Sequence, residues 1–67
     1  MSDEWTLVYS SQFRYHAELV RHMLEDNLIT AVIMDKQDSN YGIGNIEVYV
    51  RPSEALRARH LISKTEF

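Results

Sequence analysis

The order of apolar and polar positions along the chain predicts five elements in one unit, arranged strand, helix, strand, strand, helix. The strand-like runs cover residues 5–9, 30–34 and 46–50. A helical period extends from residue 12 to about residue 27, and a second helix begins near Pro52. This order restricts the fold more than any other property of the sequence does.

The first helical segment has one continuous apolar stripe, which we expect to be its core face. Phe13, Ala17, Val20 and Leu24 follow one another at helical spacing. Either Ser10 or Ser11 offers a hydroxyl to the free amides at the helix start, and Asn27 is a residue that commonly ends helices.

The three strand-like runs differ in how their apolar residues are distributed. In 46–50 the apolar residues strictly alternate with Glu47 and Tyr49, and Arg51 continues the polar face, where it could pair with Glu47. In 5–9 we expect Trp5, Leu7 and Tyr9 on one face and Val8 on the other. The run 30–34 is nearly all apolar, which is typical of a strand covered on both faces or located at a subunit contact.

These elements predict an α+β fold with a defined sheet order. A right-handed crossover through the first helix leaves the third strand to insert between the first two, which gives an antiparallel three-stranded sheet of order 1-3-2. Both helices then cover one face. The expected fold is a βαββα truncated ferredoxin-like sandwich whose other sheet face is uncovered.

The size and composition indicate a single small domain, residues 1–67, that gains from association. A chain of 67 residues buries only about 60% of its unfolded surface, and with no cysteine it has neither disulfides nor thiolate zinc sites. Self-association is a plausible source of further burial, so we expect a homo-oligomer, most simply a dimer.

Charge and hydropathy exclude several classes of partner. A net charge of −3 argues against binding to nucleic acid or to an anionic membrane. No apolar stretch approaches the roughly 20 residues that span a bilayer, and the acidic first residues do not resemble a signal peptide. Together with the absence of cysteine, these observations predict a cytoplasmic location.

The polar segment 35–45 is long for a connection between two strands and contains both glycines of the chain. The simplest interpretation is a polar hairpin turn. The functional alternative is a loop that contacts a ligand or a partner protein. The contacting residues would then be Lys36, Asp38, Ser39, Tyr41, Gly42 and Gly44.

Catalytic and metal-binding patterns are weak, so we expect no enzyme activity, no metal and no cofactor. His16 and His22 lie six residues apart, which points them in different directions on a helix, and His60 is on the other helix. No serine has the surroundings of a nucleophile elbow, and there is no thiol.

Four large side chains are candidates for a subunit interface: Trp5, Tyr9, Met34 and Tyr49. They are either ordinary core and scattered surface residues or the contact of a homodimer. In the second case the contact would use the uncovered sheet face or the free edge of the first strand, because an unprotected edge favours strand pairing.

Several short segments together resemble a small bacterial family described as prokaryotic signal-transducing proteins, which are structurally similar to PII-like regulators. The similarity covers nearly the whole chain. It is carried by Trp5 with Val8-Tyr9, by Ala17–Val20 and Leu24-Glu25, by Ile29–Val32, by Ile46–Val50, and by Ala58 with Leu61-Ile62.

The segment 36–41 is also similar to a K-x-D-S-x-Y element of one branch of that family. The family usually has glycine where Leu28 precedes Ile29, and we expect Asn27 to take over the left-handed backbone position here.

The resemblance implies a small, non-enzymatic, regulatory module whose 35–45 loop contacts a small ligand or a protein. The alternative is an interaction module that docks onto a partner protein through its open sheet face. A metal- or cofactor-dependent enzyme is the remote alternative.

Overall fold

The computed structural model describes residues 4–36 and 45–65, and its elements follow the predicted order. They are β1 (Thr6–Ser11), α1 (Arg14–Asp26), β2 (Ala31–Asp35), β3 (Ile46–Val50), the short 3-10 helix η1 (Pro52–Glu54) and α2 (Ala55–Ser63). The sheet order is β1-β3-β2, and both pairs of neighbours are antiparallel. The predicted α+β class and sheet order are confirmed, and the arrangement is compatible with a small ferredoxin-like fold.

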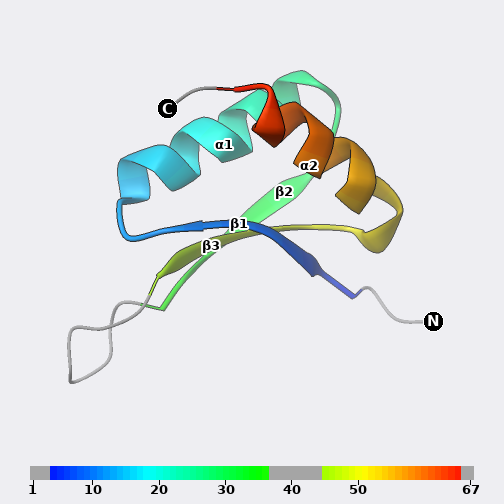
Figure 1. The fold of residues 1–67 in the computed structure, drawn as a ribbon. Helices are drawn as coiled ribbons and strands as arrows, with labels where there is room; N and C mark the ends of the chain where they lie inside the picture. Colours follow the sequence, from blue (N-terminus) through cyan, green and yellow to red (C-terminus); the bar gives the residue numbers. More distant parts are fainter. Residues whose placement is uncertain (1–3, 37–44, 66–67) are drawn as a thin grey trace.

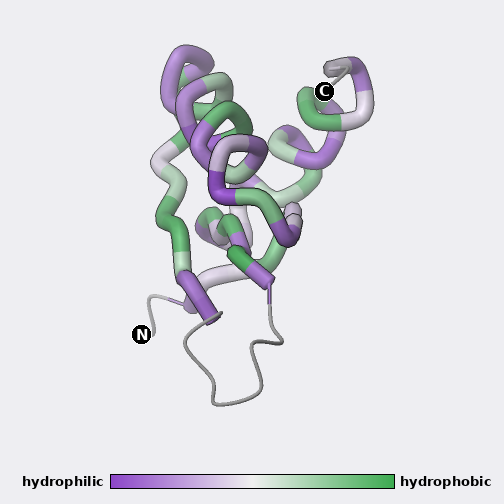
Figure 2. Tube along the Cα trace, turned by 90° about the vertical axis from the view of Figure 1, so that its left-hand side faces the viewer, coloured by the Kyte–Doolittle hydropathy of each residue, from purple (hydrophilic) through white to green (hydrophobic). Residues whose placement is uncertain are grey.

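The two helices lie on the same side of the sheet, so the fold has two layers (Figure 1). The view turned by 90° shows the same one-sided arrangement, with the strands below both helices (Figure 2). No described helix lies against the opposite side of the sheet, which we call the open face.

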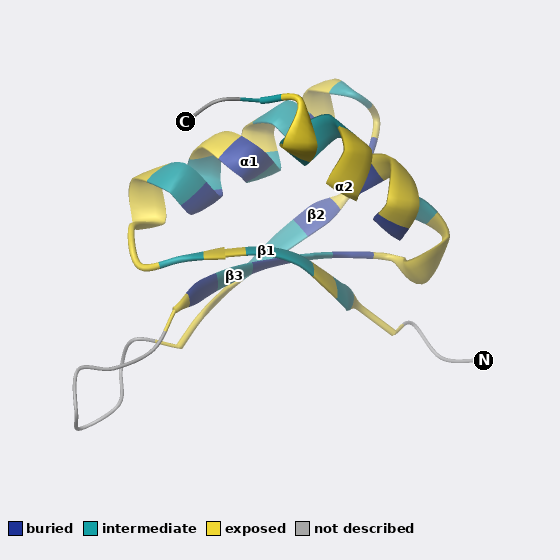
Figure 3. Ribbon diagram, in the orientation of Figure 1, coloured by how far each residue is buried: buried dark blue, intermediate teal, exposed yellow. Residues whose placement is uncertain are grey.

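The core fills the space between the helices and the sheet. Ala17, Val20 and Leu24 of α1 are fully buried, as the helical stripe predicted. They pack with the inward-facing residues of β3 and with the small residues of α2 (Figure 3). These partners are Ile46, Val48, Val50, Ala55 and Ala58. The absence of larger side chains at positions 55 and 58 lets α2 approach the sheet closely.

The start of α1 differs from the predicted one. The Ser11 hydroxyl accepts a hydrogen bond from the Phe13 amide at 3.0 Å, so the serine closes a turn before the helix and does not cap the helical amides. Phe13 has extended backbone angles and is the N-cap residue. The prediction that Phe13 belongs to the core stripe is therefore wrong, and 62% of its surface is exposed.

The end of α1 is a Schellman motif. The amide of Ile29 donates to the carbonyl of Leu24 at 2.9 Å, and the amide of Leu28 donates to the carbonyl of Glu25 at 3.0 Å. Leu28 has φ 66°, whereas Asn27 has φ −102°. The expectation that Asn27 adopts the left-handed conformation is wrong, because Leu28 itself occupies that position.

Candidate functional site

The open face carries a mostly apolar set of side chains that the strand register brings together. Leu7 of β1 and Val32 of β2 both lie opposite Tyr49 of the central strand, and Met34 lies opposite Glu47. Because residues directly opposite each other in a sheet share a face, these residues form a continuous surface. Trp5, two residues before Leu7, extends it at one end.

This surface is partly exposed to solvent. The exposed fractions are 38% for Trp5, 40% for Leu7 and 48% for Met34, and Val32 and Tyr49 are half-buried by their neighbours. Contiguous exposed apolar side chains with polar groups at their border are typical of protein-binding sites. Three of the four predicted interface residues, Trp5, Met34 and Tyr49, therefore lie together.

Tyr9, the fourth, lies on the other side of the sheet. The register between β1 and β3 shifts between Leu7 and Tyr9, so that Tyr9 is opposite Val48. This β-bulge places one extra residue, Val8, in β1 and reverses the alternation beyond it. Val8 and Tyr9 pack against the core cluster. The predicted placement of Trp5, Leu7 and Tyr9 on one face is wrong for Tyr9.

A polar cluster borders the open face at the end of β3 where residue 46 lies. The Tyr49 hydroxyl donates a hydrogen bond to Oε1 of Glu47, and Nζ of Lys36 lies 3.2 Å from the same oxygen. The hydrogen bond from Tyr49 and then that from Lys36 lower the pKa of Glu47. The hydrogen bond to Glu47 is also the main reason why the pKa values of Tyr49 and Lys36 are raised.

A cation borders the opposite end of the open face. The guanidinium carbon of Arg51 lies 5.5 Å from the centroid of the Trp5 ring, which is within the range of a cation–π interaction. The predicted pair of Glu47 with Arg51 is therefore wrong. Glu47 is bound by Lys36 and Tyr49, and Arg51 lies over Trp5.

Of the predicted loop site, only Lys36 falls within the described residues, and it is anchored to Glu47. Its amide also donates to the carbonyl of Asn45 at 3.1 Å, which extends the ladder between β2 and β3 by one pair. The remaining predicted loop residues lie outside the described residues. They are Asp38, Ser39, Tyr41, Gly42 and Gly44.

The histidines are dispersed over the helices. His22 lies 3.7 Å from Asp26 in an exposed i,i+4 pair on α1, and His60 is exposed on α2. Within residues 4–36 and 45–65, no three histidine or acidic side chains gather as a metal-binding group. The same segments enclose no pocket.

Leu7, Val32 and Arg51 are members of the open face that the sequence did not assign to an interface. Val32 precedes Met34 by two residues and so shares its face, a signal available from alternation alone. Leu7 shares a face with Trp5 for the same reason. The position of Arg51 over Trp5 depends on the register between β1 and β3, which no local pattern indicates.

No family model, curated protein or solved structure matches this chain. In the described part of the chain, neither helix combines the length and the apolar character that crossing a bilayer requires.

Proposed function

We propose that this protein is a non-enzymatic binding module that docks an amphipathic helix of a partner protein on its open face. The observation that supports the proposal is the continuous, partly exposed surface of Trp5, Leu7, Val32, Met34 and Tyr49 on the side of the sheet away from both helices. The regulatory role is the one implied by the resemblance to signal-transducing proteins, and it is part of the proposal.

The dimensions of the open face favour a helix as the occupant. Strands of five residues are about 17 Å long, and the axes of the two outer strands are about 10 Å apart. An α-helix with its side chains is about 10–12 Å wide. The opposite face of the same sheet already packs against helices, so one more helix would complete a three-layer structure (Figure 1).

The same dimensions argue against simple stacking of two open faces as a stable dimer. With these strand lengths and spacings, the open face has an area of roughly a few hundred Å². Stable interfaces bury about 800 Å² on each partner. A contact of the smaller size is typical of weak, transient signalling encounters, in which one segment docks and leaves.

The charges at the border of the open face indicate where the docked helix should carry charge. Arg51 is an exposed cation beside Trp5, whereas Lys36 at the other end is compensated by Glu47. We therefore expect the docked helix to place an acidic residue at the end near Arg51 and apolar residues at spacings of three and four over Leu7 and Tyr49.

A titration followed by NMR tests the proposal. The probe is a designed helical peptide of about 14 residues with leucines on one face and glutamates at one end, a length that matches the strands. Added to ¹⁵N-labelled protein, it should shift the amide signals of Trp5, Leu7, Val32, Met34 and Tyr49. Met34→Lys should weaken binding at least about tenfold, because it places a charge within an apolar contact.

Leu56→Lys is the matched control. Leu56 is also a large exposed apolar residue, with 82% of its surface accessible, but it lies on α2. The control variant should bind the peptide as the wild type does. Shifts confined to the helices, or equal losses in Met34→Lys and Leu56→Lys, would contradict the proposal.

A further inference from the structure

The two edges of the sheet differ in how well they are protected against strand pairing. At the edge formed by β1, Nη2 of Arg59 donates a hydrogen bond to the carbonyl of Leu7 at 3.1 Å. Leu7 also adjoins the β-bulge. A bulge and a charged side chain are two of the means by which edge strands avoid pairing with other chains. The predicted interface at a free first-strand edge is therefore not supported.

The edge formed by β2 is regular and lacks such a bulge. The Lys36 amide donates a hydrogen bond to the Asn45 carbonyl, so the backbone groups of Lys36 point toward the β3 side. Backbone groups along an antiparallel strand point to alternate sides, so those of Met34 and Val32 also point toward β3. The N–H and C=O groups of Ile33 and Ala31 consequently point away from β3. Within the described residues, no strand pairs with this side of β2.

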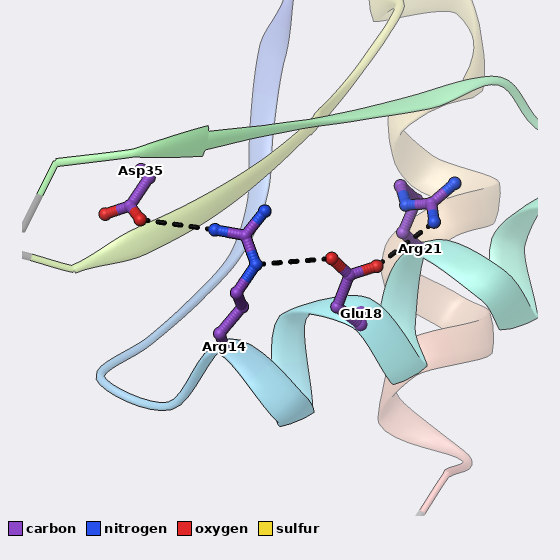
Figure 4. A network of polar contacts seen from close by, with 4 residues as sticks. All are labelled: Arg14, Glu18, Arg21 and Asp35. Carbon is purple, nitrogen blue, oxygen red and sulfur yellow. Dashed lines mark hydrogen bonds and ion pairs between the residues drawn. The ribbon is translucent and has the colours of Figure 1, made fainter.

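A row of charges on α1 runs along the same side of the molecule. Nη1 of Arg14 lies 3.2 Å from Oδ2 of Asp35 at the end of β2, and Nε of Arg14 lies 3.4 Å from Glu18 (Figure 4). Arg21 contacts Glu18 and Glu25, each at 3.1 Å. The helix therefore presents the order positive, negative, positive, negative from Arg14 to Glu25 on its β2 side.

We propose that β2 pairs antiparallel with β2 of a second copy of this chain, on a two-fold axis that passes beside Ile33. The result is a dimer with one continuous six-stranded sheet, twice the three strands of one subunit. Ile33 exchanges both backbone hydrogen bonds with Ile33 of the second copy, because its groups point outward.

The side chains of β2 are self-complementary in this register. Around Ile33, Val32 faces Met34 of the second copy on the open side, and both are apolar. Ala31 faces Asp35 on the helix side, where Arg14 already pairs with that carboxylate. No like charges lie directly opposite each other, an arrangement that would destabilise the pair.

The charge row of α1 is self-complementary about the same axis. In an antiparallel arrangement of two α1 helices, Arg14 faces Glu25 of the second copy and Glu18 faces Arg21. Ile33 lies two residues from Asp35, about 7 Å along the strand, which an α-helix covers in about four to five residues. Arg14 lies beside Asp35, and four to five residues further along α1 are Glu18 and Leu19, at the middle of the charge row. The axis beside Ile33 therefore also passes near the middle of this row.

The dimer uses the backbone edge of β2 and helix docking uses the open face, and the side chains of Val32 and Met34 lie where the two meet. Pairing at β2 leaves Trp5, Leu7 and Tyr49 exposed and joins the two open faces side by side. The inference therefore does not depend on the proposed function. It also meets the need of a small chain for further burial without covering the binding surface.

Single-cysteine variants test the contact directly, because the natural chain has no cysteine. Residues in a hydrogen-bonded antiparallel pair have Cα atoms about 5.5 Å apart, a separation that a disulfide spans. Ile33→Cys should form a covalent dimer under mild oxidation at least about tenfold faster than Leu56→Cys, a cysteine at an exposed site on α2.

Charge reversal supplies an independent test by sedimentation. Arg21→Glu places two carboxylates opposite each other across the axis and should raise the dimer dissociation constant about tenfold. The double variant Glu18→Arg with Arg21→Glu restores opposite charges and should recover the wild-type value. Arg57→Glu, which changes a charge on α2, should leave the constant unchanged. Circular dichroism melts confirm that each variant is folded.

Two results would overturn the inference. One is a wild-type protein that sediments as a monomer at concentrations of about 1 mM, the upper range of weak association. The other is a dimer that is insensitive to the Arg21 reversal and in which Ile33→Cys crosslinks no faster than Leu56→Cys. Peptide binding to the Arg21→Glu variant, whose open face is unchanged, separates this failure from a failure of the proposed function.

Discussion

The amide of Ile29 donates a hydrogen bond to the carbonyl of Leu24 at 2.9 Å, and both side chains are buried in the core. The bond closes α1 and turns the chain into β2. It requires the intervening Leu28 to adopt φ 66°, and 88% of the Leu28 surface is exposed. A leucine thus occupies a position whose backbone conformation suits glycine.

Leu28→Gly should stabilise the protein. The left-handed conformation costs about 1–2 kcal/mol for a residue with a Cβ, and the greater freedom of glycine in the unfolded chain offsets part of the gain. We expect the free energy of unfolding to rise by about 0.5–1 kcal/mol in urea titrations. Leu28→Ala keeps the Cβ and should give little of this gain. Leu56→Gly, at an exposed site within α2, should lower stability by about 1 kcal/mol.

Leu24→Ala should be strongly destabilising. Leu24 is fully buried and is among the largest side chains of the core, so its truncation leaves a cavity between α1 and the sheet. The expected loss is about 2–5 kcal/mol, against a total of about 3–10 kcal/mol for a domain of this size. Denaturant unfolding measures the difference. Leu56→Ala should change stability by less than about 0.5 kcal/mol, and equal losses in both variants would contradict the assignment of the core.

The cluster of Lys36, Glu47 and Tyr49 predicts a defined pH dependence. The pKa of Glu47 is lowered by its two hydrogen bonds, so its stabilising contribution is present above the ordinary glutamate pKa, about 4.3, and is lost as the pH falls through the lowered value. The pKa values of Tyr49 and Lys36 are raised. Their contributions are present below the ordinary tyrosine and lysine pKa values, about 10 and 10.4, and are lost as the pH rises through the raised values.

Ultraviolet absorbance titrations check this assignment. The difference between the wild type and Tyr49→Phe isolates the ionisation of the Tyr49 phenol, which should occur above the ordinary tyrosine pKa. Glu47→Gln should shift it downward, because the carboxylate that favours the protonated phenol is lost. A Tyr49 pKa that is the same in the wild type and Glu47→Gln would show that the two side chains do not interact in solution.

Removal of the Arg59 side chain should expose the β1 edge. Arg59 is on α2, and its guanidinium is bound to the Leu7 carbonyl. In Arg59→Ala that carbonyl becomes available to another chain, so we expect light scattering during heating to begin at a lower temperature and to rise with protein concentration. Arg57→Ala removes the same charge from an exposed neighbouring position on α2 and serves as the control. Equal scattering by the two variants would mean that the β1 edge needs no such protection.

Sequence patterns predicted correctly those parts of the fold in which the period of the apolar residues alone determines the local structure. The strict alternation of Ile46–Val50 identified β3 at its observed bounds, and the spacing of Ala17, Val20 and Leu24 identified the buried side of α1. Pro52 marked the turn that leads into α2.

The errors arose where local hydrogen bonds override periodicity. Phe13 continues the apolar stripe of α1, but the Ser11 hydroxyl binds its amide and leaves the ring outside the helix. Tyr9 lies one residue beyond a bulge that neither glycine nor proline marks in the sequence. Residue type led us to expect the left-handed backbone conformation at Asn27, but it occurs at Leu28. The two hydrogen bonds of the Schellman motif fix the position of the left-handed residue, whatever its side chain.

The candidate site was predicted only in part for a related reason. Trp5, Met34 and Tyr49 were grouped because they are large and lie on strands. The contacts of Lys36 with Glu47, and of Arg51 with Trp5, join residues on different strands. Such contacts depend on the register of the sheet, and pairwise register is not encoded in any short segment.

The bulge at Val8 divides β1 into two halves with separate tasks. Before it, Trp5 and Leu7 face the solvent side of the sheet; after it, Tyr9 supports the interior. Substitutions at positions 5 and 7 should therefore change the proposed binding surface while the packing of the core stays intact. Deletion of Val8 would remove the bulge and still leave Leu7 on the open face and Tyr9 toward the interior, because these two residues would then be neighbours in a regular strand opposite Tyr49 and Val48.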